Sequence, residues 1–208
     1  MKKTVWIIRH GETELNALNI VQGQGINAPL NNTGHDQALQ FWQYYHEIPF
    51  DLVLYSNLLR SQQTVNSFLT KGVQAAQLDD LKEINWGVNE GQASSPIVMQ
   101  RFQDVQNAWQ NGDFDARIEG GESANEMALR ARNCINYLKE IKRNQILVCS
   151  HGRTIRALVC LMHYESLEKM EEYHHANLGL YKFELEHNKW NCILKNDTKH
   201  LLKSLQMN

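Results

Sequence analysis

Short apolar runs alternate along the chain with longer stretches in which apolar residues recur every three or four positions. The short runs predict buried strands, and the longer stretches predict amphipathic helices. Strands are expected at 5–8, 51–55, 73–78, 145–149, 178–185 and 190–194, and helices at 33–45, after Asn57, and at 96–110, 123–142 and 152–162. This alternation predicts an α/β fold: a three-layer sandwich whose mostly parallel central sheet carries helices on both faces.

Two segments, 33–36 and 123–126, have the residue pattern of a capping box and are expected to begin the helices that run to Tyr45 and to about Lys142. Near the carboxyl end, the pair His187 and Asn188 separates two strand patterns and predicts a hairpin turn. The residues from Asp197 onward carry only weak signals.

The segment 88–121 interrupts this regular alternation. It holds one helical pattern, formed by Ile97, Arg101, Phe102, Val105 and Trp109, between loops at 89–95 and 111–121. We interpret it as a small cap inserted into a single domain that spans residues 1–208.

The composition limits which kinds of protein this chain is expected to be and which partners it is expected to bind. With 208 residues, 42% of them hydrophobic, the chain can bury a sizeable core. The net charge of −2 offers no broad basic surface for nucleic acid or an anionic membrane, so neither is an expected partner. No apolar run has the length of a membrane span, and no cleavable leader is evident, so a cytoplasmic protein is expected. The four cysteines form no CxxC motif and are expected to be reduced core thiols.

Two strand patterns end in histidine and glycine. The first leads into Arg9, His10 and Gly11, and another into His151 and Gly152. Carboxyl ends of strands are where α/β proteins place binding residues, so the two histidines are expected to share one site. Gly11 is expected to let the backbone approach a ligand closely.

The residue types at these ends suit phosphoryl chemistry. A neutral His10 imidazole can attack phosphorus, and the guanidinium groups of Arg9 and Arg60 can hold phosphoryl oxygens. His151, with the Gly152 amide at a helix start, suits the same anion, and Glu83 suits protonation of a leaving alkoxide. Each residue also has an ordinary interpretation: a surface or core histidine, a solvated arginine, a surface glutamate.

Ordered motifs along nearly the whole chain resemble the histidine phosphatase superfamily, the phosphoglycerate mutase-like group. The matching positions are Arg9 to Thr13 with Asn16, Pro29-Leu30, Thr33-Gly34, Gln37-Ala38, Ser56, Leu59 to Ser61, Gln63-Thr64, Leu81 to Ile84, Gly87, Gly91, Gly120 to Ser123, Val148 to Gly152, Asn196 to Thr198 and His200-Leu201.

The resemblance implies a two-step reaction through a phosphohistidine. His10 is then the nucleophile, Glu83 the general acid and later the base, and Arg9, Arg60 and His151 the phosphoryl-binding groups. Asn16 and the loop of Gln22 and Gly23 match pocket positions of the family. The scheme needs no cofactor or metal. In a rival scheme, His10, His151 and Glu83 hold a metal ion, but Arg9 and Arg60 would repel a divalent cation there.

Hydrolysis and mutase-type transfer are both compatible with these residues. Phosphoglycerate mutases are longer and carry an Arg-His-Tyr-Gly stretch after the acid, whereas Ile84 to Gly87 follow it here. The cap holds only the scattered Arg101 and Arg117. These departures favour a phosphatase acting on a small phosphomonoester. A catalytically idle phospholigand-binding protein is the third alternative.

The sequence leaves the substrate and the oligomeric state undetermined. Four aromatic residues could line a binding wall or simply pack in the core: Trp86, Phe102, Trp109 and Phe114.

Overall fold

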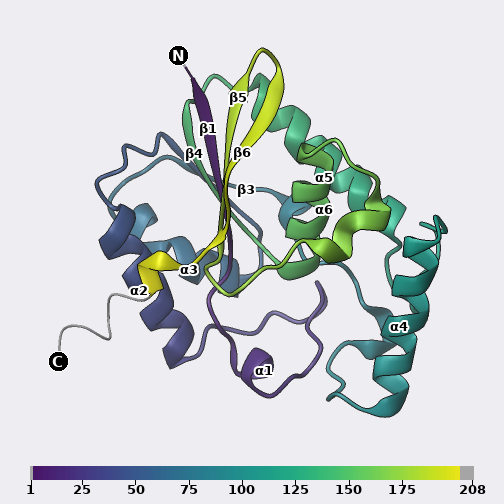
Figure 1. The fold of residues 1–208 in the computed structure, drawn as a ribbon. Coiled ribbons are helices and arrows are strands. Elements are labelled where there is room, and N and C mark those ends of the chain that lie inside the picture. Colours follow the sequence, from purple (N-terminus) through teal and green to yellow (C-terminus); the bar gives the residue numbers. More distant parts are fainter. Residues whose placement is uncertain (1, 202–208) are drawn as a thin grey trace.

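A computed structural model describes residues 2–201, and within them a six-stranded sheet forms the centre of the molecule (Figure 1). Its strands are β1 (Lys3–Arg9), β2 (Leu52–Tyr55), β3 (Ala75–Gln77), β4 (Gln145–Ser150), β5 (Leu180–Glu186) and β6 (Lys189–Asp197). Their order across the sheet is β3-β2-β4-β1-β5-β6. The first four strands in that order run parallel, β5 is antiparallel to β1, and β6 is antiparallel to β5. The predicted mostly parallel sheet is confirmed.

Helices cover both faces of the sheet (Figure 1). The helices α2 (Asn32–Tyr45) and α3 (Leu59–Thr70) lie on one face, and α5 (Ala124–Glu140) and α6 (Gly152–Met162) on the other. Because successive strand residues point to opposite faces, Trp6 and Ile8 join the core beneath α2 and α3, while Val5 and Ile7 join the core beneath α5 and α6. The predicted three layers are therefore confirmed.

Shorter elements connect these layers. They are α1 (Glu14–Ala17) and four 3₁₀ helices: η1 (Asp79–Leu81), η2 (Gly87–Asn89), η3 (Leu167–Glu172) and η4 (Lys199–Leu201). The remaining helix, α4 (Pro96–Gln110), packs against η3 and lies at the edge of the molecule, away from the sheet (Figure 1).

Several predicted boundaries were wrong. The helix α2 begins at Asn32 because the side chain of Asn31 accepts a hydrogen bond from the Gly34 amide at 2.8 Å, so Asn31, and not Thr33, is the N-cap. The capping box of Ser123 and Glu126 is confirmed. The helix α5 ends at Glu140 because the next residue, Ile141, is already extended.

The bounds of the last two strands, β5 and β6, also differ from the predicted ones. The first begins at Leu180, because Leu178 has a φ of 54° and cannot join a strand, and the second continues to Asp197. The turn between them is confirmed at His187 and Asn188, which have φ values of 47° and 62° as a tight hairpin requires.

On α4, the residues Val105 and Trp109 are buried as predicted, but Ile97 is 61% exposed. In the last described turn, the buried ring of His200 packs edge-on against Phe41 of α2. Residues 202–208, for which the pattern was also weak, lie outside the described part. Among residues 2–201, no helix is long and apolar enough to cross a membrane.

Candidate active site

The two strand-end histidines meet because β1 and β4 are parallel neighbours. Arg9 and Ser150, the last residues of the two strands, pair in register, and a histidine follows each of them. The His10 amide donates a hydrogen bond to the Ser150 carbonyl oxygen at 3.0 Å, and the ring centroids of His10 and His151 are 5.0 Å apart. The sheet register therefore places the two histidine rings side by side.

The imidazole of His10 is held in one tautomer. Its Nδ1 atom lies 2.7 Å from the Gly11 carbonyl oxygen, and because a carbonyl can only accept, Nδ1 carries the proton. The Nε2 atom then keeps its lone pair. The ring is 3% exposed, and its pKa lies well below 6.5 because burial disfavours the charged form, with further lowering from the charges of Arg60 and Arg9. His10 is therefore neutral, as a nucleophile must be.

Arg9 leaves β1 beside this ring. One terminal nitrogen, Nη1, donates to the backbone carbonyl of His175 at 3.3 Å, whereas its buried Nε has no hydrogen-bond partner among the described residues. An unpaired buried donor on a cation is costly unless an acceptor completes it. An anion bound beside His10 would supply that acceptor.

Arg60 and His151 form a buried pair behind His10, and neither is exposed. Arg60 Nε donates to His151 Nδ1 at 3.2 Å, so Nδ1 must hold a lone pair and Nε2 must carry the proton. That Nε2 donates to the Ser56 hydroxyl at 2.6 Å. Both ring nitrogens are thus engaged by the protein, and the ring orients Arg60. Burial lowers the pKa of Arg60 to about 10, which leaves it charged.

The side chain of Glu83 is buried at the N-terminus of α6. Its oxygens accept from the amides of Arg153, at 3.1 and 3.2 Å, of Thr154 at 3.2 Å and of Ile84 at 3.0 Å. These hydrogen bonds hold the Glu83 side chain in one position at the pocket.

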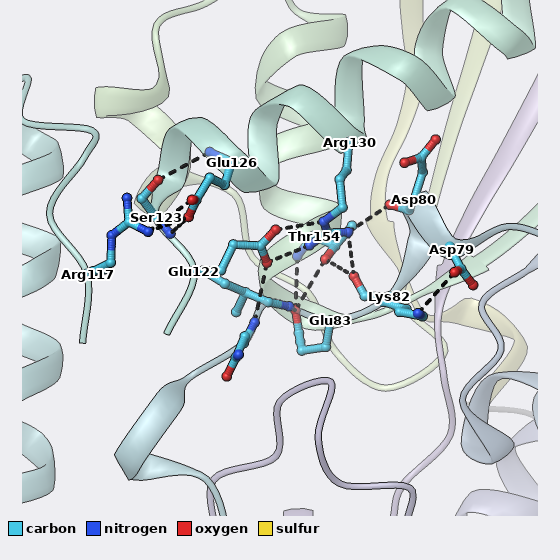
Figure 2. Close-up of polar contacts among 12 residues, drawn as sticks. Asp79, Asp80, Lys82, Glu83, Arg117, Glu122, Ser123, Glu126, Arg130 and Thr154 are labelled. Carbon is cyan, nitrogen blue, oxygen red and sulfur yellow. Dashed lines mark hydrogen bonds and ion pairs between the residues drawn. The ribbon is translucent and has the colours of Figure 1, made fainter. Parts of the chain in front are cut away.

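An ion pair outside the pocket secures the segment that carries Glu83 (Figure 2). Arg130 of α5 donates to the carbonyl oxygens of Asp80 and Lys82, and both of its other nitrogens bind Glu122 at 2.7 Å. Glu122 in turn accepts from the Asn85 amide. This clamp brackets Glu83 on both sides and so limits its movement.

Beside His10, Arg9 and Glu83 lies a pocket of about 220 Å³. Its lining includes the predicted site residues Arg9, His10, Asn16, Gln22, Glu83 and Gly152, together with Val21, Trp86, Phe102, Arg153 and His175. The predicted residues Gly23, Arg60 and His151 lie next to the pocket without lining it. Of the aromatic residues noted in the sequence, Trp86 and Phe102 line the pocket, whereas Trp109 and Phe114 pack in the core.

Three glycines at the site are required by close packing. A Cβ on Gly11 would lie 2.6 Å from the Gly34 carbonyl oxygen, so the structure shows a close approach to α2 at this position. A Cβ on Gly152 would lie 2.7 Å from the ring of His175. A Cβ on Gly23 would lie 2.7 Å from the Ile84 carbonyl oxygen, and the carbonyl of Gly23 accepts from Arg60 at 3.3 Å.

Polar side chains of the α1 region order the rim. The Asn16 side chain accepts from the Thr13 amide, and Gln22 donates to the Thr13 hydroxyl at 2.6 Å. The buried oxygen of Gln22 has no partner among the described residues. Both side chains are therefore held at the pocket and leave polar atoms for a ligand.

Sequence reasoning missed two charged or titratable side chains of the pocket, Arg153 and His175. Arg153 follows His151 by two residues and could have been suspected from that spacing. His175 lies in an irregular segment with no motif and reaches the site because its carbonyl binds Arg9. It also missed Asn177, whose side chain donates to the His10 carbonyl at 2.8 Å.

No group of three or more His, Cys, Asp or Glu side chains in residues 2–201 is arranged to hold a metal ion. The rival metal scheme is further weakened by the commitment of both His151 nitrogens to Arg60 and Ser56. Cysteine is a poor alternative nucleophile, since burial raises the pKa of Cys149 to about 12.

We expect the buried neutral histidines to make the fold sensitive to acid. In the unfolded chain they bind protons below about pH 6.5, whereas folded His10 and His151 do so only at much lower pH. The contribution of each neutral histidine to the free energy of unfolding is therefore fully present above pH 6.5. It is lost as the pH falls below that value, by about 1.4 kcal/mol per pH unit for each histidine. Denaturant titrations of the His10→Asn variant should show a slope smaller by that amount between pH 6 and 5.

The exposed His35 provides the control for this measurement. The His35→Asn variant should keep the slope of the parent protein. Equal slopes for the parent and His10→Asn would contradict the proposal that His10 is neutral in the folded state.

Several known proteins are similar to this chain in sequence or in structure. The sequence model of the histidine phosphatase superfamily (branch 1) matches residues 5–198. A fructose-2,6-bisphosphatase TIGAR B of Danio rerio is 27% identical over 205 residues, which cover 96% of this chain and 75% of that protein. A "probable phosphoglycerate mutase GpmB" of Erwinia tasmaniensis is 32% identical over 157 residues, which cover 74% and 72%. The solved structure of an α-ribazole phosphatase from Shigella flexneri has a TM-score of 0.82 at 25% identity, covering 93% and 96%.

Proposed function

We propose that this chain, which belongs to the histidine phosphatase superfamily (branch 1), is a phosphatase that hydrolyses small phosphorylated metabolites through a phosphohistidine. The related fructose-2,6-bisphosphatase and α-ribazole phosphatase support this reaction class. The observation that carries the proposal is the His10 tautomer. Its Nδ1 proton is bound by the Gly11 carbonyl, so a neutral nitrogen with a free lone pair lies beside the cation of Arg9.

In the first step, His10 Nε2 attacks phosphorus, and the bond between phosphorus and the ester oxygen breaks. The phosphoryl oxygens carry the charge of this transition state, and Arg9 and Arg60 are the groups that stabilise it. Protonated Glu83 gives its proton to the leaving alkoxide. The product alcohol then departs and leaves a phosphohistidine with an ionised Glu83.

In the second step, the Glu83 carboxylate takes a proton from a water molecule as that water attacks the phosphohistidine. The bond between phosphorus and Nε2 breaks, and inorganic phosphate leaves. The α6 amides that bind Glu83 hold its carboxylate in position for this step. Asn16, Gln22 and Gly152 complete the phosphoryl site in this proposal, and His151 orients Arg60.

The segment 88–121 acts as the cap of this site within one domain. Its support is the position of Phe102 on α4, which lines the pocket while α4 itself lies away from the sheet (Figure 1). A pocket of about 220 Å³ suits a small metabolite, because sites for drug-sized ligands measure roughly 300–1,000 Å³. The net charge of −2 gives no reason to propose a nucleic acid or membrane partner. The four free cysteines support a reducing compartment, the cytoplasm.

Mutase-type transfer is the second candidate, favoured by the 32% identity to the mutase of Erwinia tasmaniensis. The two functions separate in one assay with 3-phosphoglycerate, with and without the bisphosphate. A phosphatase releases inorganic phosphate from the monophosphate. A mutase returns 2-phosphoglycerate and releases little phosphate.

We expect hydrolysis to continue after all metal ions are removed, because His10 supplies the nucleophile that a metal-bound hydroxide would otherwise provide. The measurement is the initial rate of phosphate release from an aryl phosphate before and after exhaustive chelation. A metal-dependent phosphatase treated in parallel confirms that chelation is complete. A full loss of rate that a divalent ion restores would exclude the metal-free mechanism.

A further inference from the structure

Besides Arg9, a second cationic side chain lines the pocket, that of Arg153. Arg153 is only 9% exposed, and it lies on the first turn of α6, two residues after His151. Its backbone amide binds Glu83, but no step of the proposed hydrolysis uses its guanidinium. A nearly buried cation without a role in the reaction therefore faces the same pocket as His10.

Aromatic rings hold this guanidinium in place. Its central carbon lies 5.4 Å from the ring centroid of Trp86 and 5.6 Å from that of Trp109. Trp86 is also part of the pocket lining. These contacts fix the guanidinium without using its hydrogen-bond donors.

The charge of Arg153 is only partly balanced. Its Nη1 binds one oxygen of Glu171, and the other oxygen of Glu171 binds Arg156 at 2.7 Å. One carboxylate thus lies between two guanidinium groups, which leaves an excess of positive charge. Within residues 2–201, the Nε and Nη2 atoms of Arg153 form no hydrogen bond.

The remaining neighbour, His175, adds no charge. Its ring packs against Gly152, and its buried Nδ1 has no partner among the described residues. Burial, and then the charges of Arg9, Arg156 and Arg153, lower the pKa of His175 to about 3. This part of the pocket therefore offers unpaired guanidinium donors and a neutral imidazole, the groups that bind an anion.

We infer that Arg153 forms a second anion-binding subsite, which selects phosphomonoesters that also carry a carboxylate or a second phosphate. This inference rests on the proposed function, because His10 and Arg9 must take the phosphoryl group that is transferred. The carboxylate and the second phosphate share the same chemistry toward a guanidinium, so the experiment must distinguish them.

The test measures binding by calorimetry in the His10→Ala background, where the ligand is not turned over. Two matched ligand pairs differ only in the second anion: 3-phosphoglycerate with glycerol 3-phosphate, and fructose 2,6-bisphosphate with fructose 6-phosphate. We expect at least one doubly anionic ligand to bind about 10- to 100-fold more tightly than its partner. The pair that shows the preference identifies the anion.

In the His10→Ala protein, the further substitution Arg153→Gln should remove that preference. It should leave the affinity for the singly phosphorylated ligand of each pair unchanged. The fold should tolerate this change because Glu171 keeps its bond to Arg156. The exposed Arg117, which is paired with Glu126, is the matched control, and Arg117→Gln should keep the preference. Glu171→Gln removes the competing carboxylate and should strengthen binding of the doubly anionic ligand.

In the enzyme with His10 intact, Arg153→Gln should raise KM for the preferred ligand and leave kcat unchanged, since the second anion does not react. Equal affinities within both pairs, or equal losses for both members of a pair in Arg153→Gln, would overturn the inference. If the preference appeared in binding but the enzyme with His10 intact released no phosphate from these ligands or from an aryl phosphate, the phosphatase proposal would fail and the subsite would stand.

Discussion

The His10→Ala variant is expected to lose phosphate release by more than about 10,000-fold, because the change removes the attacking nitrogen. The buried Cys149 is protonated, and both nitrogens of His151 are engaged by Arg60 and Ser56. The measurement is the initial rate with an aryl phosphate, with His35→Ala as a control on an exposed histidine.

The parent protein should also form a phosphoryl adduct on His10. A phosphorus–nitrogen bond is labile in acid and stable in base, which separates it from serine and threonine phosphoesters. Rapid quenching followed by mass mapping should locate the adduct, and His10→Ala should lack it. An adduct on another residue, or an active alanine variant, would remove His10 from the role of nucleophile.

The Glu83→Gln variant is expected to lose activity according to the leaving group. An alkoxide needs a proton to depart, so hydrolysis of alkyl phosphates should slow by about 100- to 10,000-fold. The aryloxide of an aryl phosphate departs without that proton. The rate of the first step with an aryl phosphate should therefore fall much less. Single-turnover formation of the phosphoenzyme with both substrate types measures this difference without interference from the second step.

Arg9 provides the contrast for this experiment. Its unpaired Nε would bind a phosphoryl oxygen whatever the leaving group is, so Arg9→Gln should slow all substrates alike and weaken inhibition by vanadate. Arg60→Gln should behave in the same way if it folds, which its thermal unfolding will show. A leaving-group effect in an arginine variant, with none in Glu83→Gln, would reverse these assignments.

In that event the proton donor would have to be sought elsewhere, and the structure already narrows the choice. Glu122 accepts hydrogen bonds from Nε and Nη2 of Arg130 and from the Asn85 amide. Glu12 accepts a hydrogen bond from the side chain of Asn31. Neither lines the pocket. Among the residues that line it, Glu83 is the carboxylate.

The sequence by itself was enough for the layers of the fold and for the residues at the strand ends. The continuous apolar run from Val5 to Ile8 marks a strand that is buried on both faces, because helices must cover each face of such a strand. The motifs at His10 and His151 are also local, because a strand followed by histidine and glycine can be recognised wherever its partner lies. The capping box at Ser123 was predicted for the same reason.

Register, tautomers and charge balance were decided only by the tertiary structure. The pairing of Arg9 with Ser150 brings the histidines together, but nothing in either segment specifies that register. The placement of Arg153 between Trp86 and Trp109 depends on a cap helix far along the chain. His175 and Arg9 meet across 166 residues of sequence. Such contacts arise when distant elements pack, so a local pattern cannot carry them.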